Sequence, residues 1–355
     1  MPLSNMKHLS WRKIYIPEAK CALGGDYCIH VKKGDPTRLV FHLCGGGISW
    51  SKESAKWPMV REVAETYGQI GLYTIYADRH PELSSITTGE RNGLHSTTPE
   101  NPFAEWSEVM VPYVTADFHT GRADFPFTGA DGKEYILHHR GYDNLQIILK
   151  LTKELFPSVD HLLISGESAG AFGVSANAAE IMGLYPACDD ITILADSSFV
   201  PCEEWAEAAK TIWNTPPHIT AHLKTDNMAL DWLRGLYAAC GDKPRYLFCC
   251  GNYDHTLIEY WHYTKDGRFL MDEAYTKAFM GKLVHMCRDL KSLSPRFGIY
   301  IHNFTHDVPN PCVRHCIFGN ACFTKEEVGN VTPAAWLKDA SEDRIYDVGM
   351  ELLEE

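Results

Sequence analysis

The sequence alternates apolar stretches of strand length with segments of helical length. The apolar stretches are rich in β-branched and aromatic residues and occur at 38–43, 71–76, 109–114, 161–165, 191–195, 246–250 and 298–304. Helical length and composition mark residues 141–155, 168–182, 203–213, 227–239 and 272–290. Alternating strands and helices predict a parallel sheet joined by right-handed crossovers, and strands that are apolar on both sides predict helices on both faces. We therefore expect an α/β fold with a mostly parallel central sheet and helices on both faces.

Composition narrows the partners that such a chain can have. The 33 Lys and Arg residues against 46 Asp and Glu residues give a net charge of −13, which disfavours nucleic acid. No run approaches the roughly 18 apolar residues of a membrane span, so we expect no membrane contact. The first residues, MPLSNMKHLSWRK, contain no apolar stretch of a secretory signal, which predicts a cytoplasmic location.

The chain has no internal repeat and no linker rich in Pro, Gly or Ser. This predicts one domain over residues 1–355, with loop insertions and a core at about 38–310. Twelve cysteines are too sparse for a disulfide scaffold. The group of Cys312, Cys316 and Cys322 with His315 resembles metal ligands but lacks the C-x2-C pairs of structural zinc, so we expect a local disulfide or simple packing there. We expect no metal and no other cofactor.

The turn after the stretch 161–165 has the sequence Gly166-Glu167-Ser168-Ala169-Gly170. In parallel sheets, chemistry gathers at the carboxyl ends of the strands. The pattern G-x-S-x-G between a buried strand and a helix indicates a nucleophile elbow, in which the serine occupies a sharp, strained turn. Small residues at such a turn also occur for packing reasons alone. Ser168 is therefore the candidate nucleophile.

An acid and a histidine complete such a site, in the chain order serine, acid, histidine. Asp254 lies four residues past the stretch 246–250 and His306 lies two residues past the stretch 298–304. In these positions His306 would take the serine proton, and Asp254 would orient the imidazole.

Other residues compete for both roles. Asp196 follows the stretch 191–195 and is the rival acid, while Asp254 also suits a helix N-cap. The rival histidines are His255, His302 and His315.

Acyl transfer also needs hydrogen-bond donors for the negatively charged oxygen of the intermediate. The triple glycine 45–47 directly follows a core strand, and the expected donors are the amides of Gly46, Gly47 and Ala169. The alternative is a flexible turn without a binding role. Neither phosphate-binding glycine pattern, G-x-x-x-x-G-K-[ST] or G-x-G-x-x-G, occurs in this loop.

Several aromatic residues are expected on loops near this site. Trp50, Trp57, Trp106 and Phe118 suit stacking on sugar rings or lining an acyl pocket, and they suit core packing equally well. Trp50, Trp106 and Phe118 are the candidate substrate-binding residues.

Four segments resemble the pectin acetylesterase and Notum family of serine carboxylester hydrolases. They are LCGGGISW at 43–50, NPFAEWSEVMVPYVTADFHTG at 101–121, LISGESAGAFGV at 163–174 and ILADSSFV at 193–200. The resemblance implies an α/β-hydrolase-like fold.

The resemblance assigns the same site residues, with Ser168 as nucleophile, Asp254 as acid and His306 as base. The oxyanion donors that it implies are the amides of Gly46, Gly47 and Ala169. It also implies that Asp196 is structural and that Asp117 and Gly121 shape a loop near the pocket.

These patterns predict a serine esterase that acts through an acyl-enzyme intermediate. The resemblance implies that it removes acetyl groups from O-acetylated carbohydrate. The alternatives are a general short-chain carboxylesterase or lipase-like hydrolase, and an inactive scaffold that only binds. A peptidase or thioesterase would use the same three residues. The substrate is a small-molecule or carbohydrate ester in the leading case.

Overall fold

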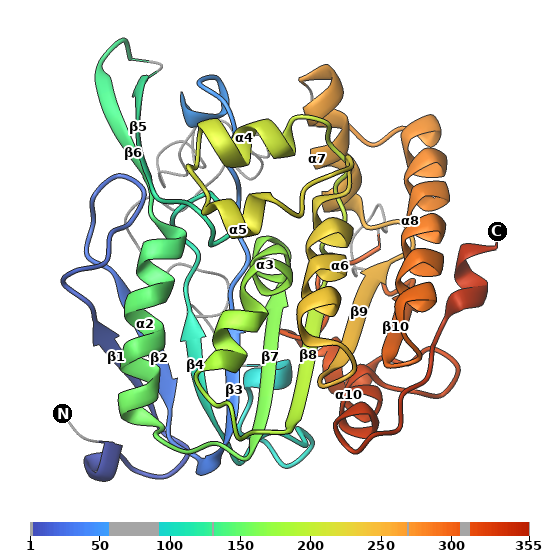
Figure 1. Cartoon of the computed structure of the whole chain (residues 1–355). Coiled ribbons are helices and arrows are strands. Elements are labelled where there is room, and N and C mark those ends of the chain that lie inside the picture. Colours follow the sequence, from blue (N-terminus) through green and yellow to red (C-terminus); the bar gives the residue numbers. More distant parts are fainter. Residues whose placement is uncertain (1–2, 57–91, 130, 268–269, 306–312, 355) are drawn as a thin grey trace.

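A computed structural model describes residues 3–56, 92–129, 131–267, 270–305 and 313–354. Its centre is an eight-stranded sheet with the order β1-β2-β4-β3-β7-β8-β9-β10 (Figure 1). The strands are β1 (Trp11–Tyr15), β2 (Cys28–Lys32), β3 (Asp35–Leu43), β4 (Trp106–Val111), β7 (His161–Glu167), β8 (Asp190–Asp196), β9 (Arg245–Gly251) and β10 (Phe297–His302). A separate antiparallel hairpin is formed by β5 (Ala123–Thr128) and β6 (Glu134–His139).

The six strands from β4 to β10 in the sheet run parallel to one another, and β2 and β1 add an antiparallel edge. The expected mostly parallel sheet is thus confirmed. The carboxyl ends of β3, β7, β8, β9 and β10 meet at one edge of the sheet, which Figure 1 shows as the upper edge. Ser168 and Asp254 follow strands that end at this edge.

Helices follow most of the parallel strands. The described helices are α2 (Gly141–Leu155), α3 (Ala169–Gly183), α4 (Trp205–Thr211), α5 (Pro217–Thr220), α6 (Met228–Cys240), α7 (His255–Asp266), α8 (Glu273–Leu293), α9 (Cys322–Lys325) and α10 (Pro333–Ser341). Within the described residues, no helix is both long enough and apolar enough to span a membrane.

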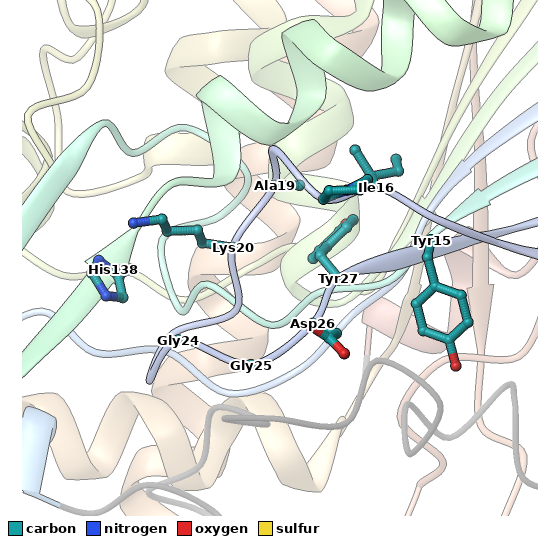
Figure 2. Close-up of a pocket in the computed structure, with 10 residues that line it drawn as sticks. Tyr15, Ile16, Ala19, Lys20, Gly24, Gly25, Asp26, Tyr27 and His138 are labelled. Atoms are coloured by element: carbon teal, nitrogen blue, oxygen red, sulfur yellow. The ribbon is translucent and has the colours of Figure 1, made fainter.

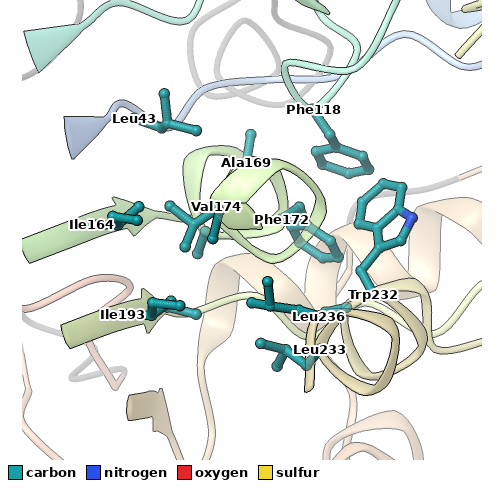
Figure 3. Close-up of a cluster of buried hydrophobic side chains, with 14 of the residues drawn as sticks. Leu43, Phe118, Ile164, Ala169, Phe172, Val174, Ile193, Trp232, Leu233 and Leu236 are labelled. Atoms are coloured by element: carbon teal, nitrogen blue, oxygen red, sulfur yellow. The ribbon is translucent and has the colours of Figure 1, made fainter. Parts of the chain in front are cut away.

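Alternation along the buried strands divides the core between the two faces of the sheet. In β7, Leu162 and Ile164 belong to the large cluster that includes residues of α2, α3, α6 and α8. Figure 3 shows part of this cluster, where Phe172 and Val174 of α3 lie between Ile164 and the α6 side chains Leu233 and Leu236. Leu163 faces the other way, into a second cluster with Trp336 of α10. Helical cover on both faces follows from strands that are apolar on both sides.

The predicted elements that fall on described residues match the structure closely. The stretch expected at 141–155 is helix α2 with the same bounds, and the other four predicted helices correspond to α3, α4, α6 and α8 within a few residues. The strand expected at 71–76 lies outside the described residues.

A hollow of about 570 Å³ lies beside the edge strand β1 and is shown in Figure 2. Three strands, β2, β4 and β3, separate β1 from β7 in the sheet, so this hollow is distinct from the turn that holds Ser168. It is lined by Tyr15, Ile16, Pro17, Ala19, Lys20, Gly24, Gly25, Asp26, Tyr27 and His138.

Candidate active site

Ser168 stands alone between the last residue of β7 and the first residue of α3. Its backbone has φ 51° and ψ −124°, a conformation that costs free energy for any residue with a side chain. The amide of Ser168 donates a 2.7 Å hydrogen bond to the carbonyl oxygen of Asp196 on β8. Ser168 is partly exposed while its two chain neighbours are buried. This is the geometry that a nucleophile elbow requires.

The glycines of the turn are needed because other backbone segments approach it closely. A Cβ atom on Gly166 would overlap the carbonyl oxygen of Gly170, and one on Gly170 would overlap the carbonyl oxygen of Leu43 at the end of β3. A Cβ on Gly45 would lie only 2.8 Å from the Cβ of Ser168. The glycine loop after β3 is therefore packed directly against the serine turn.

That close packing places backbone amides beside Ser168. Gly46 is exposed and Gly47 is buried, and Ala169 is the first residue of α3, where an amide has no acceptor inside the helix. Among the described residues, the backbone hydrogen bonds outside helices and strands do not use Gly46, Gly47 or Ala169 as donors. These three amides are thus available at the edge where Ser168 lies.

Asp254 is completely buried and follows β9 as the N-cap of α7. Its Oδ1 accepts a 3.1 Å hydrogen bond from the amide of Leu257, and its Oδ2 lies 2.8 Å from Nδ1 of His315. The capping role and the pairing with a histidine, which the sequence presented as alternatives, occur together. The carboxylate is held by the helix end while it holds the imidazole.

The loop that carries His315 returns to the sheet edge after β10. Val313 forms bridges with both Thr305 and Asp254, which places His315 beside Asp254 although it is thirteen residues past the end of β10. His306, the histidine predicted as the base, lies outside the described residues. Inspection of the residues just past a strand end favoured His306 and left His315 as a rival, because it takes no account of a loop that folds back.

Two other histidines near Asp254 make different contacts. His255 Nδ1 lies 2.8 Å from the carbonyl oxygen of Val313, so this ring fixes the returning loop. His302 is fully buried at the end of β10, where desolvation lowers its pKa to about 4 and its ring stacks on Phe304 with centroids 5.0 Å apart. Among the described histidines, His315 is the one hydrogen-bonded to Asp254.

The environment of His315 favours a protonated ring. Burial lowers its pKa, but the charge of Asp254 and the hydrogen bond to it raise the pKa further, so that the net pKa lies above 6.5. Asp196 and Glu167 add to this rise. A histidine with such neighbours readily accepts a proton from a hydroxyl group during a reaction.

Asp196 links the serine turn to the histidine loop. Its Oδ2 accepts hydrogen bonds from the amides of Ile317 (2.8 Å) and Phe318 (3.1 Å), and its carbonyl oxygen accepts the amide of Ser168. Desolvation raises the pKa of this buried carboxyl, and the hydrogen bonds oppose the rise. These contacts fit the structural role that the family resemblance implied for Asp196.

Asp117 organises the loop after β4. Its side chain accepts hydrogen bonds from Thr115 Oγ1 and from the amides of His119, Gly121 and Gly141. Complete burial raises its pKa to about 7, against the effect of these hydrogen bonds. His119 in turn places Nε2 3.0 Å from the carbonyl oxygen of Cys44, so the loop that Asp117 organises also contacts the glycine loop.

Two of the aromatic candidates for substrate binding lie close to the site, and their side chains pack into the core. Trp50 and Phe118 lie at the carboxyl edge, but both are buried: Trp50 packs edge-on against Trp205 at 5.6 Å, and Phe118 stacks on Phe172 at 4.3 Å. Trp57 lies outside the described residues.

The expectation for Trp106 is wrong. Trp106 begins β4, and its ring lies 6.1 Å from that of His161 at the start of β7, at the opposite end of the strand from Ser168. The strand begins three residues earlier than the sequence indicated, which places Trp106 at the amino end instead of in a loop near the site.

Cys316 and Cys322 are buried free thiols. Cys312 lies outside the described residues. Among the described residues, no group of three or more His, Cys, Asp or Glu side chains is arranged to hold a metal ion.

A mostly parallel sheet with a strained serine after a central strand, and an acid and histidine pair at the same edge, defines the class of α/β hydrolases. The chain belongs to the pectinacetylesterase family, whose model matches residues 16–215. It is a carboxylic ester hydrolase.

Among solved structures, the fold is similar to that of the Wnt deacylase Notum from Drosophila. The TM-score is 0.63 at 16% sequence identity, and the alignment covers 96% of each chain. No curated protein matches the sequence. The matched family segment contains the glycine loop and Ser168 but ends before Asp254 and His315, so the model of the family does not reach the acid and histidine pair.

Proposed function

We propose that this protein is a serine esterase in which Ser168 is the nucleophile, His315 the general base and Asp254 the acid that orients His315. The hydrogen bond between Asp254 Oδ2 and His315 Nδ1 carries the proposal, since it leaves Nε2 of the ring as the atom that can accept a proton. Asp196 supports it, because one residue binds both the serine turn and the loop of His315. His315 thus replaces His306 in the scheme.

In this scheme His315 takes the proton of the Ser168 hydroxyl while Oγ attacks the ester carbonyl. The amides of Gly46, Gly47 and Ala169 stabilise the oxyanion of the tetrahedral intermediate. The proton then passes to the leaving alcohol, and an acyl-enzyme remains. Water, activated by His315, releases the acid and restores Ser168.

The acyl group that we propose is acetyl, carried by a carbohydrate. Membership of the pectinacetylesterase family supports this substrate class. The packing beside α3 supports a short acyl group, because Phe118 is in ring contact with Phe172, Trp205 and Trp213, and these side chains fill the space around the first turns of the helix.

A general short-chain carboxylesterase is the second candidate. The same ring packing favours it over an enzyme for long acyl chains, and the contacts near Ser168 do not by themselves select a sugar as the alcohol. The similar solved structure is that of a Wnt deacylase, so an acylated protein is a further candidate class of substrate.

The test compares p-nitrophenyl acetate, butyrate and octanoate, and an acetylated and a deacetylated pectin fragment, using the wild-type chain and Ser168→Ala. We expect acetate to be preferred, acetic acid to be released from the acetylated fragment, and the variant to lose about 10⁴-fold or more in rate. Preference for octanoate would contradict the proposed acyl group. Equal rates in both proteins would contradict Ser168 as the nucleophile.

A further inference from the structure

A set of buried charged side chains lies behind the serine turn, on the face of the sheet opposite α3. Lys32 on β2 and Glu108 on β4 are both fully buried, with Nζ and Oε2 3.5 Å apart. His95, in the short helix η5 (Gly93–His95), is 1% exposed and places Nδ1 2.5 Å from Oε1 of Glu108. Burying charges is costly unless they are paired, and the acyl transfer described above uses none of these groups.

The set extends to the residue before the nucleophile. Glu167 ends β7 on the same face and is 8% exposed. A Cβ built on Gly319 would lie 2.8 Å from Oε2 of Glu167 and 3.8 Å from Nε2 of His95, so both side chains border the same point. Nε2 of His95 has no hydrogen-bond partner among the described residues. The free side of this ring is therefore close to the Glu167 carboxyl group.

Glu167 also borders the loop that carries His315. Glu167 pairs with Asp196 across β7 and β8, and Asp196 binds the amides of Ile317 and Phe318 in that loop. Gly319, which contacts Glu167, follows in the same segment. The titratable groups that interact with Glu167 are His95 on η5, Asp196 on β8, and His315 and Cys316 on the returning loop.

The balance of these neighbours puts the ionisation of Glu167 near neutral pH. Desolvation raises its pKa to about 7, Asp196 raises it as well, and His95 and His315 lower it. In the reverse direction, Glu167 raises the pKa of His315.

We propose that Glu167 is a positioning residue that acts through His315, on the side of the sheet that it shares with His95. The ionised carboxylate stabilises the imidazolium that forms when His315 takes the proton of Ser168. Glu167 itself gains and loses no proton in the acylation step, in which the proton moves from Oγ to Nε2 and then to the leaving alkoxide. This inference rests on the proposed function of Ser168 and His315.

The test measures the pH dependence of fluorophosphonate labelling and of p-nitrophenyl acetate hydrolysis in the wild type, Glu167→Gln and Glu180→Gln. Glu180 is the control because it is a partly buried carboxylate on α3 that pairs with Tyr142 and His218, away from the serine turn. In Glu167→Gln we expect the acidic limb of both pH–rate profiles to move down by roughly 0.5–1 pH unit. We also expect the rates of labelling and hydrolysis above pH 8 to fall about 3- to 10-fold. Glu180→Gln should match the wild type in both the position of the acidic limb and the rate above pH 8.

A second readout does not depend on activity. A carboxyl whose pKa is about 7 when folded and 4.5 when unfolded loses stability as the pH rises between these values, because the unfolded state ionises first. In Glu167→Gln this part of the pH dependence of unfolding should be absent, so the variant gains in melting temperature relative to the wild type above pH 7.

The outcomes separate the two proposals. An unlabelled wild type would contradict the proposed function. A labelled wild type with an unchanged pH profile in Glu167→Gln would overturn only the role of Glu167. If Glu167→Gln does not fold, His95→Gln gives a second test, because it removes the side chain that lowers the pKa of Glu167. The acidic limb of its pH–rate profile should move, and an unmoved limb would overturn the proposal.

Discussion

The carboxylate of Asp254 binds the imidazole of His315 through Oδ2 at 2.8 Å while its Oδ1 caps α7 through the amide of Leu257. One buried side chain therefore joins three segments: the end of β9, the first turn of α7 and the loop that returns after β10. Because the helix cap fixes the carboxylate, the imidazole receives a fixed orientation as well.

This double role predicts different results for two substitutions of Asp254. Asn caps a helix as well as Asp does, so Asp254→Asn should leave the melting temperature nearly unchanged. It should lower kcat by about 10⁴-fold, because an amide cannot hold the required tautomer of the histidine or stabilise its charged form. Asp254→Ala should lower kcat by a similar factor and should also lower the free energy of unfolding by about 1 kcal/mol. Thermal melts and rates of ester hydrolysis test both variants. Full activity in Asp254→Asn would contradict the functional pairing of Asp254 with His315.

The raised pKa of His315 predicts the pH dependence of the reaction. His315 must be neutral to accept a proton, so kcat/KM should fall as the pH drops through its pKa, with the half-maximal rate above pH 6.5. For stability the sign is opposite: a histidine pKa raised by folding stabilises the chain below pH 6.5, and the benefit is lost as the pH rises through the folded value. A rate that stays flat between pH 5 and 8 would count against a histidine base.

The close packing of the serine turn predicts a contrast between two glycines of one helix. In Gly170→Ala the new methyl group meets the carbonyl oxygen of Leu43, which should cost at least ~3 kcal/mol of stability and most of the activity. Gly183, at the end of α3, has no atom within 4 Å of an added Cβ, so Gly183→Ala should gain ~0.5 kcal/mol. Urea unfolding measures the stability of both variants. Equal stability would show that Gly170 is not packed tightly against the carbonyl oxygen of Leu43.

The contacts of Asp196 predict a positioning effect on the loop of His315. Asp196→Ala leaves the amides of Ile317 and Phe318 without their acceptor, which should cost about 1–3 kcal/mol and lower kcat more than it changes KM. Asp196→Asn keeps an oxygen for these amides and should retain most of the activity. Steady-state kinetics of the two variants separate the hydrogen bonds from the charge, and a larger loss in Asp196→Asn would contradict this assignment.

The sequence predicted the parallel strands and the long helices because their apolar patterns are continuous. It missed β1 and β2, which are short and include charged residues such as Arg12, Lys13 and Lys32. It also missed α7, whose apolar side chains are interrupted by His262 and Thr264. Local pattern carries little information where an element is defined by its neighbours in space.

For the candidate site, Ser168 and Asp254 could be proposed from their positions after strands, whereas the histidine that pairs with Asp254 could not be selected among the rivals. G-x-S-x-G has a local physical cause, the strained turn, which the structure shows directly. The partner of Asp254 depends on the path of the loop between β10 and Val313, and no local pattern reports such a path. Glu167 was part of the motif, but its burial beside His95 depends on contacts with η5 and Gly319.

The central claim is that the pair of Asp254 and His315 activates Ser168. The most direct measurement is the rate at which a fluorophosphonate labels the purified chain, with the modified peptide identified by mass spectrometry, in the wild type, His315→Gln and His306→Gln. We expect label on Ser168 in the wild type and in His306→Gln, and a loss of at least about 10³-fold in the labelling rate in His315→Gln. Rapid labelling of His315→Gln, together with loss in His306→Gln, would contradict it.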